Sequence, residues 1–421
     1  MSSPHPATLD EARAVPLNKI QTRLMESLDR PNDAGIADAV DFIICQGAYH
    51  GASDLHLEPW AEVLSIRYRI DGILQQIAII PRGQMLKVVA RIKVLADLIV
   101  YRKDVPQDGR IDAEKTSSGR PMRVSTVPTV KGEKIVIRLL GERQEIYNLD
   151  TLGFQEKVCD GLRTLVGRSQ GLLLLTGPSS SGKTTTIYSL IREMMAQQKN
   201  TTNIVTIEDP VEYTMDKISQ IQVNPHVEFT FANALRSILR QDPEVIMVGE
   251  IRDMETAQIA VQAGLTGHFV ISTIHSGTAC GVFTRLLDMG IEPFLIASSV
   301  SGVMAQRLVR LNCAKCTKPW EPGPVLRAHF NMKGKKGTFF KGKGCEACQG
   351  IGYRGRASLG ELLVVNTAVA QHVLERPTTE HLHATAVKQG METLAEDGLK
   401  KALKGITTLE ELVRVLPTAL A

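Results

Sequence analysis

Residues Leu172 to Tyr188 read LLLLTGPSSSGKTTTIY. The apolar run from Leu172 to Leu175 predicts a buried parallel strand, and residues 185–195 predict the helix that follows it. Between them, residues 177–184 match the phosphate-binding pattern G-x-x-x-x-G-K-[ST] at every required position. A chance turn rich in glycine and serine would read similarly, but the flanking strand and helix favour a phosphate site.

The residue types in this loop suit a nucleotide phosphate and its magnesium ion. Gly177 and Gly182 can adopt backbone angles that wrap N–H groups around an anion, and the helix N-terminus adds its positive dipole end. Lys183 supplies a positive charge for the β- and γ-phosphates, and the Thr184 hydroxyl is placed to ligate Mg²⁺. We therefore expect ATP and Mg²⁺ to be bound by Gly177, Pro178, Ser179, Ser180, Ser181, Gly182, Lys183, Thr184 and Thr185.

The chain of 421 residues is long enough for about two to four domains. Its net charge of +4 gives no strong case for binding nucleic acid. The first residues are polar and rich in proline, unlike a signal peptide, and no apolar run approaches the roughly 20 residues that span a bilayer. We expect a cytoplasmic protein with only peripheral membrane contact. Its seven cysteines argue against a disulfide framework there.

The sequence of the N-terminal third predicts a tail that is followed by a small domain. We expect residues 1–30 to be a flexible tail with one weak helix at 19–28, and 31–142 to form a PAS-like α/β domain. Asp108-Gly109 indicates a turn in it. Arg123 and Arg138 lie within or beside predicted strands, where a charge is most easily explained by an anion. Residues 143–152 are expected to link this domain to the phosphate-loop region.

Residues 153–310 alternate buried strands with helices, which predicts a parallel, doubly wound sheet of the RecA-like type. Two of these strands end in carboxylates, Glu208 and Glu250. A carboxylate there can hold Mg²⁺ or take a proton from the attacking water. We assign Glu250 as the base and Glu208 to positioning the magnesium-bound water. The reverse assignment stays open, as does a plain structural role in capping a helix or pairing with an arginine.

Two histidines, His268 and His275, flank the predicted strand FVISTI. Two at the ends of one strand, in a sheet with a phosphate site, could sense the γ-phosphate or relay between subunits. A purely structural role is an equal alternative for each.

Four cysteines form two CxxC pairs, Cys313 with Cys316 and Cys345 with Cys348. This spacing suits a closed tetrahedral Zn²⁺ site with a structural role, although the 28 residues between the pairs exceed the common spacing. Four reduced free cysteines are the alternative. We place the zinc module at residues 311–350 and a C-terminal helical region at 351–421. The module is locally basic, and a solvated loop explains its lysines more simply than lipid binding: Lys333, Lys335, Lys336, Lys341 and Lys343.

Several segments together resemble the secretion ATPase family that powers type II secretion and type IV pilus assembly. Besides the phosphate loop, they are VTIEDPVE (205–212), LRQDPEVIMVGEIRD (239–253) and TGHFVISTIH (266–275). SDLHLEP (53–59), RIDG (69–72), PQDGRI (106–111) and RVSTVPTVKGEKIVIRLL (123–140) resemble its N-terminal domain. The tetracysteine insertion is similar to that of its assembly and secretion branch, which favours this branch over pilus retraction.

The resemblance implies a homo-hexameric ring with ATP between the N-terminal and RecA-like domains. Arg123 and Arg138 fall where the family places phosphate-contacting arginines, and Arg236 and Arg240 fall where it has another pair near the site. The chain departs from the family at Ser179-Ser180, where Thr-Gly is common, and at Ser276-Gly277, where Thr-Asn is usual. We also expect it to lack the extra N-terminal domain that many assembly members use for membrane recruitment.

We therefore expect a cytoplasmic hexameric motor ATPase at the bacterial inner membrane. It would act on a membrane platform protein to assemble a type IV pilus or a type II secretion pseudopilus. One alternative is a nucleic-acid translocase or helicase on the same scaffold, which the modest charge disfavours. Another is a non-catalytic nucleotide-binding ring subunit, which the intact Lys183, Glu208 and Glu250 disfavour.

Overall fold

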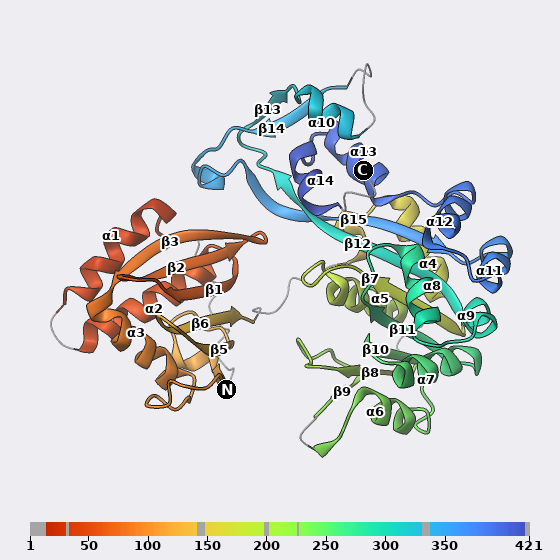
Figure 1. Ribbon diagram of the computed structural model, residues 1–421, viewed down its shortest axis with the longest axis horizontal. Helices are drawn as coiled ribbons and strands as arrows, with labels where there is room; N and C mark the ends of the chain where they lie inside the picture. Colours follow the sequence, from red (N-terminus) through yellow and green to blue (C-terminus); the bar gives the residue numbers. More distant parts are fainter. Residues whose placement is uncertain are drawn as a thin grey trace. The chain divides into compact units, whose positions relative to one another are not determined.

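The computed structural model of the chain describes residues 14–30, 33–140, 148–197, 202–224, 227–330 and 337–416 (Figure 1). The chain divides into two compact units, Met1–Gln144 and Glu145–Ala421. We call them the N-terminal unit and the ATPase unit, and describe each by itself.

The N-terminal unit is an antiparallel sheet of six strands covered by helices. The strand order is β3-β2-β1-β6-β5-β4. Apolar side chains of the helices and of alternate strand positions form one core. The elements are α1 (Leu17–Leu28), α2 (Asp33–Tyr49), β1 (Ala52–Pro59), β2 (Val63–Ile70), β3 (Ile73–Pro81), α3 (Arg82–Leu95), β4 (Gln107–Ile111), β5 (Met122–Thr129) and β6 (Gly132–Leu139).

The structure changes two local predictions for this unit. The helix expected at 19–28 is present as α1, but it does not belong to a flexible tail, because Ile20, Leu24 and Leu28 recur every four residues and are buried in the core. Residues 1–13 lie outside the described residues. The turn expected at Asp108-Gly109 lies inside strand β4. A Cβ atom on Gly109 would come within 2.4 Å of the Ala96 carbonyl oxygen, so this glycine allows a close backbone approach.

The ATPase unit is built on a seven-stranded sheet of order β15-β12-β7-β11-β10-β8-β9. Six of the strands, from β12 to β9 in this order, run parallel to one another. The seventh, β15, pairs with β12 in the antiparallel direction. The strands are β7 (Gly171–Thr176), β8 (Ile204–Glu208), β9 (Ser219–Gln222), β10 (Val245–Ile251), β11 (Phe269–Ile274), β12 (Val300–Asn312) and β15 (Tyr353–Val364).

Helices cover both faces of this sheet, as predicted for a doubly wound α/β fold. Leu172 and Leu174 of β7 pack into one hydrophobic cluster, whereas Leu173 and Leu175 pack into another. The second cluster holds buried side chains of α4 (Glu156–Val166) and α5 (Lys183–Gln197). The first holds those of α6 (Phe231–Ile238), α7 (Met254–Leu265), α8 (Ala279–Asp288) and α9 (Pro293–Ser299), and of four further helices toward the C-terminus.

The last third of the chain is less separate than the sequence analysis predicts. Strand β15 lies in the expected C-terminal helical region, yet it pairs with β12 along the edge of the ATPase sheet, from Gly302↔Val364 to Asn312↔Tyr353. The 3₁₀ turn Leu149–Leu152, placed in the expected linker, buries Leu149 in the core of the same unit. The remaining elements are α10 (Pro324–His329), β13 (Thr317–Trp320), β14 (Phe339–Gly342), α11 (Thr367–Leu374), α12 (Thr379–Lys388), α13 (Leu394–Leu403) and α14 (Leu409–Val415).

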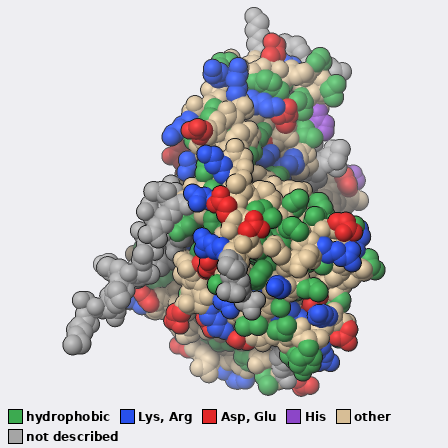
Figure 2. Space-filling model, turned by 90° about the vertical axis from the view of Figure 1, so that its left-hand side faces the viewer, with side chains coloured by type: hydrophobic (Ala, Val, Ile, Leu, Met, Phe, Trp, Pro, Cys, Tyr) green, Lys and Arg blue, Asp and Glu red, His purple; other side chains and the backbone are tan. Residues whose placement is uncertain are grey.

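The surface carries charges of both signs. On the face seen in Figure 2, lysine and arginine side chains are interspersed with aspartate, glutamate and hydrophobic ones. Of the module lysines, Lys341 pairs with Glu410 at 2.6 Å, while Lys333, Lys335 and Lys336 lie outside the described residues. A helix with the length and apolarity to cross a bilayer is absent from the part of the chain that the structure describes.

Candidate functional site

The phosphate loop opens on a cavity of about 190 Å³ at the carboxyl ends of β8, β10 and β11. This is the edge at which open α/β sheets place their ligands. The cavity brings together six of the residues predicted from sequence. They are Ser179, Lys183, Thr184, Glu208, Glu250 and His275.

The two glycines of the loop have the backbone angles that their positions require. Gly177 has φ +153° and Gly182 has φ +88°. A Cβ atom on Gly177 would lie 2.5 Å from the carbonyl oxygen of Gln306, so a larger residue does not fit there. Ser180 also has a left-handed backbone, with φ +61°. This is the position where the sequence departs from glycine, and the loop keeps the conformation that glycine favours.

Lys183 is the first residue of α5, and its ammonium group lies over the loop. The Nζ atom donates hydrogen bonds to the carbonyl oxygens of Gly177, at 2.9 Å, and Pro178, at 3.0 Å. Burial lowers the pKa of Lys183, although the nearby Glu250 carboxylate opposes this. A partly desolvated cation at this point is suited to binding a phosphate anion.

Glu250, near the end of β10, has an arginine and a histidine side chain beside its carboxylate. Arg252 donates a hydrogen bond to its carboxylate, and the Nε2 atom of His275 lies 3.7 Å from it. The Arg252 hydrogen bond holds the pKa of Glu250 below its ordinary value, so the carboxylate is ionised at neutral pH. Sequence analysis missed Arg252, although its place two residues after the strand-end carboxylate is a usable signal.

Glu208, at the end of β8, is held by three donors inside the protein. Its carboxylate accepts hydrogen bonds from the hydroxyls of Tyr188 and Thr206 and from the Gln220 amide. Burial and the carboxylate of Glu208 raise the pKa of Tyr188. None of these partners was predicted, because they come from α5, β8 and β9 and share no motif. Glu208 therefore lines the cavity as part of a buried polar network.

Three predicted site residues of the ATPase unit lie away from this cavity. His268 precedes β11 and contacts the Ala263 carbonyl oxygen at 3.2 Å, whereas His275 follows the strand. A strand of six residues spans about 20 Å, so the two histidines lie at opposite edges of the sheet. Arg236 pairs with Glu255, and Arg240 donates to the Arg236 carbonyl oxygen at 3.0 Å. The structure does not bring these three residues to Lys183.

In the N-terminal unit, Arg123 and Arg138 are direct cross-strand partners on β5 and β6. Arg110 of β4 pairs with Arg123 on its other side, so three arginines form one row. All three line a cavity of about 570 Å³. Asp54 offsets the end of the row, because its carboxylate accepts from Arg138 Nε at 2.9 Å. Adjacent like charges destabilise a sheet, and an anion over the row would relieve this.

The four predicted zinc ligands meet at one point of the ATPase unit. The Sγ atoms of all four cysteines lie within 4.8 Å of one another. The closest Sγ–Sγ distances are 3.7–3.8 Å, and a tetrahedron with Zn–S bonds of about 2.3 Å requires sulfur spacings of about 3.8 Å. The Gly352 N–H donates to Cys348 Sγ at 3.2 Å, as expected for a thiolate. The residues therefore fit Zn²⁺: Cys313, Cys316, Cys345 and Cys348.

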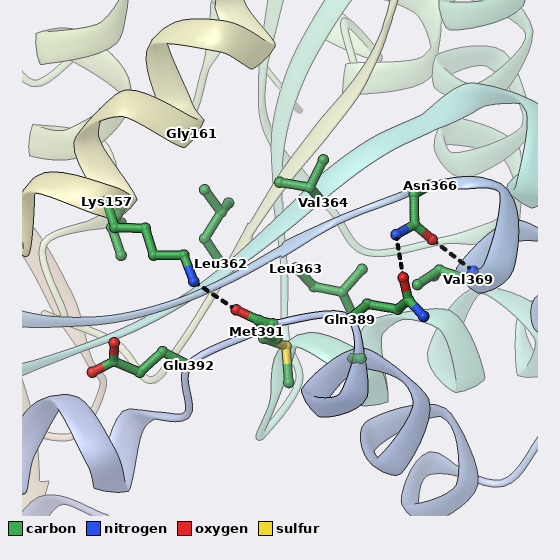
Figure 3. Close-up of a pocket in the computed structure, with 13 residues that line it drawn as sticks. Lys157, Gly161, Leu362, Leu363, Val364, Asn366, Val369, Gln389, Met391 and Glu392 are labelled. Atoms are coloured by element: carbon green, nitrogen blue, oxygen red, sulfur yellow. Dashed lines mark hydrogen bonds between the residues drawn. The ribbon is translucent and has the colours of Figure 1, made fainter.

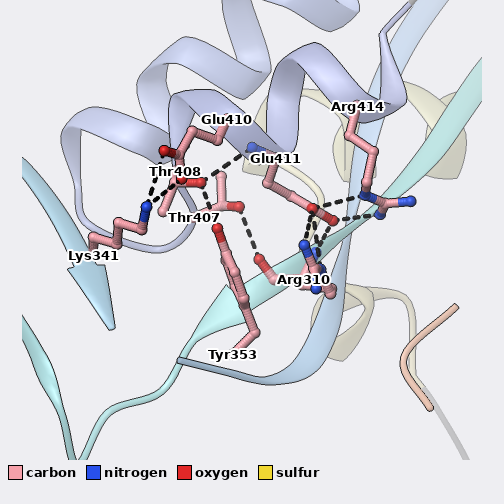
Figure 4. Close-up of polar contacts among 8 residues, drawn as sticks. All are labelled: Arg310, Lys341, Tyr353, Thr407, Thr408, Glu410, Glu411 and Arg414. Carbon is pink, nitrogen blue, oxygen red and sulfur yellow. Dashed lines mark hydrogen bonds and ion pairs between the residues drawn. The ribbon is translucent and has the colours of Figure 1, made fainter. Parts of the chain in front are cut away.

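A buried ion-pair network joins the sheet to the last helix (Figure 4). Glu411 of α14 accepts two hydrogen bonds from the Arg310 guanidinium, at 3.0 and 2.8 Å, and also pairs with Arg414. Arg310 lies over the Tyr353 ring, 4.1 Å from its centre, and the Tyr353 hydroxyl lies 2.7 Å from Thr408 Oγ1. These contacts fix α14 on β12 at Arg310, three residues before the first cysteine of the module.

A second cavity in this unit, of about 240 Å³, has a different chemistry (Figure 3). It lies between α4, β15 and α12, and its lining is mostly aliphatic, with Leu362 and Met391 among its residues. At its edge, Lys157 donates to the Gly390 carbonyl oxygen at 2.9 Å. The mainly charged and polar cavity at the phosphate loop is therefore the better nucleotide site.

Comparisons with known proteins show the family of the chain. Residues 29–414 match the family described as type II/IV secretion system protein. The chain is 45% identical over 389 residues to the type II secretion system ATPase E of Vibrio cholerae, covering 92% of this chain and 76% of that protein. It is 42% identical over 374 residues to the type IV pilus assembly ATPase PilB of Thermus thermophilus, covering 88% of this chain but only 42% of that longer protein.

Solved structures show the same fold. The crystal structure of the pilus retraction motor PilT with bound ADP matches 90% of this chain and 96% of its own, with 26% identity and a TM-score of 0.58. The Legionella pneumophila ATPase DotB matches 89% of this chain and 94% of its own, with a TM-score of 0.64 and 20% identity. The family resemblance predicted from sequence is confirmed, and the chain belongs to the type II/IV secretion system proteins as a P-loop ATPase of that family.

Proposed function

We propose that this ATPase is the hexameric motor that assembles a type II secretion pseudopilus or a type IV pilus at the inner membrane. The observation that carries the proposal is the cavity in which Lys183, Thr184 and Glu250 meet. The 45% identity to the type II secretion system ATPase E supports a role in a machine of this kind. In this role the chain would be peripheral to the membrane and would act on a platform protein within it.

Each residue of the cavity has a distinct task in this proposal. Lys183 and the loop N–H groups bind the β- and γ-phosphates of ATP, and the Thr184 hydroxyl holds Mg²⁺, which neutralises phosphate charge. Glu250 is ionised and accepts the proton of the attacking water. Glu208, with its hydroxyl partners, orients the magnesium-bound water. His275 lies close enough to Glu250 to respond to its change of protonation.

The arginine row of the N-terminal unit supplies the remaining charge. We infer that Arg123 and Arg138 contact the phosphates of a nucleotide held by the loop, with Arg110 beside them. Binding would then draw the two units together, and hydrolysis would release them. We propose in addition that Arg236 and Arg240 act near this site, which rests on the family resemblance alone.

The tetracysteine module is proposed to hold one structural Zn²⁺. Four thiolates leave no open coordination position, so the ion would supply rigidity and no reaction step. By role, we propose an N-terminal domain at 31–142, an ATPase core at 153–310, a zinc module at 311–350 and a C-terminal region at 351–421, whose strand β15 completes the ATPase sheet.

The test measures ATP hydrolysis by the purified protein and secretion or piliation in a bacterium that carries the gene. Lys183→Ala should abolish ATP hydrolysis together with secretion or piliation, while the purified protein keeps its zinc. Stimulation of the ATPase by a cytoplasmic fragment of the platform protein should be seen with the parent chain. Stimulation by DNA in place of that fragment would contradict the proposal and favour a nucleic-acid translocase.

A further inference from the structure

Strand β12 continues beyond the point where its neighbour β7 ends. The first two residues of β12 past this point lie against the phosphate loop. Ala305 pairs with Thr176, the last residue of β7. Gln306 and Arg307 therefore extend beside the loop, and both are buried, with 0% and 6% of their surfaces exposed. Burial of an amide and a guanidinium is costly unless both have partners, so their contacts indicate what these residues do.

Gln306 contacts the phosphate loop directly. Its Nε2 atom donates a hydrogen bond of 2.7 Å to the carbonyl oxygen of Ser181. Its backbone oxygen is the atom that a side chain at Gly177 would meet. The buried Gln306 Oε1 and Ser181 Oγ atoms have no hydrogen-bond partner among the described residues. One residue of β12 thus binds the loop at Ser181 and lies close against it at Gly177.

Arg307 joins the loop to the turn that follows β11. Its NH2 group donates to the Gly277 carbonyl oxygen at 2.7 Å, and its NH1 group donates to the Gln306 carbonyl oxygen at 2.9 Å. A second contact supports the same junction, because Ser276 N–H donates to Thr176 Oγ1 at 2.9 Å. This turn begins at His275, which reaches Glu250, so Arg307 lies between the phosphate loop and the residues around the base.

The charge of Arg307 lacks an ion-pair partner among the residues that the structure describes. In the described part of the chain, no carboxylate lies within 4.0 Å of its guanidinium, and both of its recorded partners are neutral carbonyl oxygens. Glu361 attracts it from farther away, but that carboxylate accepts hydrogen bonds from the N–H groups of Ala279 and Leu394. Arg307 and Lys183 are therefore two partly buried cations beside one loop, an arrangement that an anion stabilises.

We propose that Arg307, together with Gln306, is a positioning residue for the nucleotide phosphates. Gln306 sets the shape of the phosphate loop through Ser181. Arg307 clamps the loop to the Ser276-Gly277 turn and adds a buried positive charge behind it. Bound phosphate supplies the counter-charge that Arg307 lacks. This inference rests on the ATPase activity and does not require the proposed secretion or pilus role.

The test compares charge with hydrogen bonding at one position of the full-length protein. Arg307→Gln keeps a donor near Gly277 and removes the charge, whereas Arg307→Lys keeps the charge. We expect Arg307→Gln to weaken ADP binding by about tenfold to a hundredfold, the range for losing one charged interaction of a buried group. KM for ATP should rise by a similar factor and kcat should change less. Arg307→Lys should stay within about threefold of the parent.

The control variant is Arg376→Gln, the same change at an arginine that is 61% exposed and pairs with Glu292. It should bind ADP like the parent. If Arg307→Gln does not fold, Gln306→Met tests the loop contact independently and should raise KM by several-fold. ADP binding within twofold of the parent in Arg307→Gln, at unchanged melting temperature, would overturn the proposal, as would an Arg307→Lys variant that binds as weakly as Arg307→Gln.

Discussion

The Nε2 atom of His275 lies 3.7 Å from a carboxylate oxygen of Glu250, although the two residues end neighbouring parallel strands and are 25 positions apart. Arg252 contacts the same carboxylate. Glu250 is thereby held ionised beside Lys183, at the point where a water molecule would attack a phosphate. The carboxyl ends of two adjacent strands therefore position the carboxylate that we propose as the base.

Removing the negative charge of Glu250 should separate binding from turnover. Glu250→Gln is expected to lower kcat by about 10²- to 10⁴-fold, the usual contribution of a general base, and to keep ADP affinity. Steady-state hydrolysis and fluorescent ADP titration measure the two effects. Lys183→Ala is the comparison, because it should lose binding as well. Unchanged turnover in Glu250→Gln would remove Glu250 as the base.

The dependence of kcat on pH should also report the ionisation of Glu250. Since the Arg252 hydrogen bond lowers the pKa of Glu250, this carboxylate stays ionised as the pH falls from 7 towards 5. Its loss as a base should begin only below its ordinary pKa of 4.5. In Arg252→Gln, the acid limb of kcat should move to higher pH. A limb that stays in place would show that another group controls it.

The left-handed backbone at Ser180 predicts a stabilising substitution. A residue with a Cβ atom at φ +61° is strained, whereas glycine adopts this angle freely. Ser180→Gly should raise the free energy of unfolding of the ATPase unit by about 1 kcal/mol. Ser179→Gly is the control and should be neutral or destabilising, because only the freedom of the unfolded chain changes there. Denaturant titration without nucleotide distinguishes the two.

The row of arginines in the N-terminal unit should act on turnover and not on folding. Arg123→Ala and Arg138→Ala are each expected to lower kcat/KM by about 10²-fold, as for loss of one donor to a developing charge. The melting temperature of Arg123→Ala should hold or rise, because like charges are separated, whereas Arg138→Ala also loses its ion pair with Asp54. Arg82→Ala serves as the control, since Arg82 is exposed and contacts Glu62 at 3.4 Å in the same unit. Full activity in both variants would contradict the phosphate contact.

Glu411 should contribute to stability in a pH-dependent way. Burial opposes its ionisation, but hydrogen bonds from Arg414 and Arg310 outweigh this and lower its pKa. Its contribution is therefore present above the unfolded value near 4.5 and is lost as the pH falls through the lower, folded value. Glu411→Gln should cost about 3 kcal/mol at pH 7, because Arg310 and Arg414 lose their counter-charge. The difference from the parent should shrink in denaturation experiments below pH 4.5.

Zinc content tests the cysteine module. The purified chain should bind one Zn²⁺, and Cys345→Ser should reduce the bound metal and lower the melting temperature, because the remaining thiolates cannot close a tetrahedron. Cys280→Ser is the control, since this buried cysteine lies outside the cluster. Metal analysis of both proteins decides the point, and equal zinc in the two would contradict the site.

The sequence by itself determined the phosphate loop, the alternation of strands and helices and the two CxxC pairs. These features are local: a strand, a glycine-containing loop and a helix are set by residues within about 20 positions of one another. The same local reasoning was wrong at Gly109, where a close backbone approach decides the structure. It predicted the helix α1 but not the packing of the buried stripe on that helix.

Only the tertiary structure decided which charged groups share the site. It brings Arg252 and His275 into contact with Glu250. It surrounds the Glu208 carboxylate with hydrogen-bond donors from Tyr188, Thr206 and Gln220. It leaves His268 at the opposite end of β11 from the phosphate loop. It also places Arg307 of β12 behind the phosphate loop, more than 120 positions along the chain. Strand order and register set these contacts, and both arise from packing between distant segments, which no single stretch of sequence encodes.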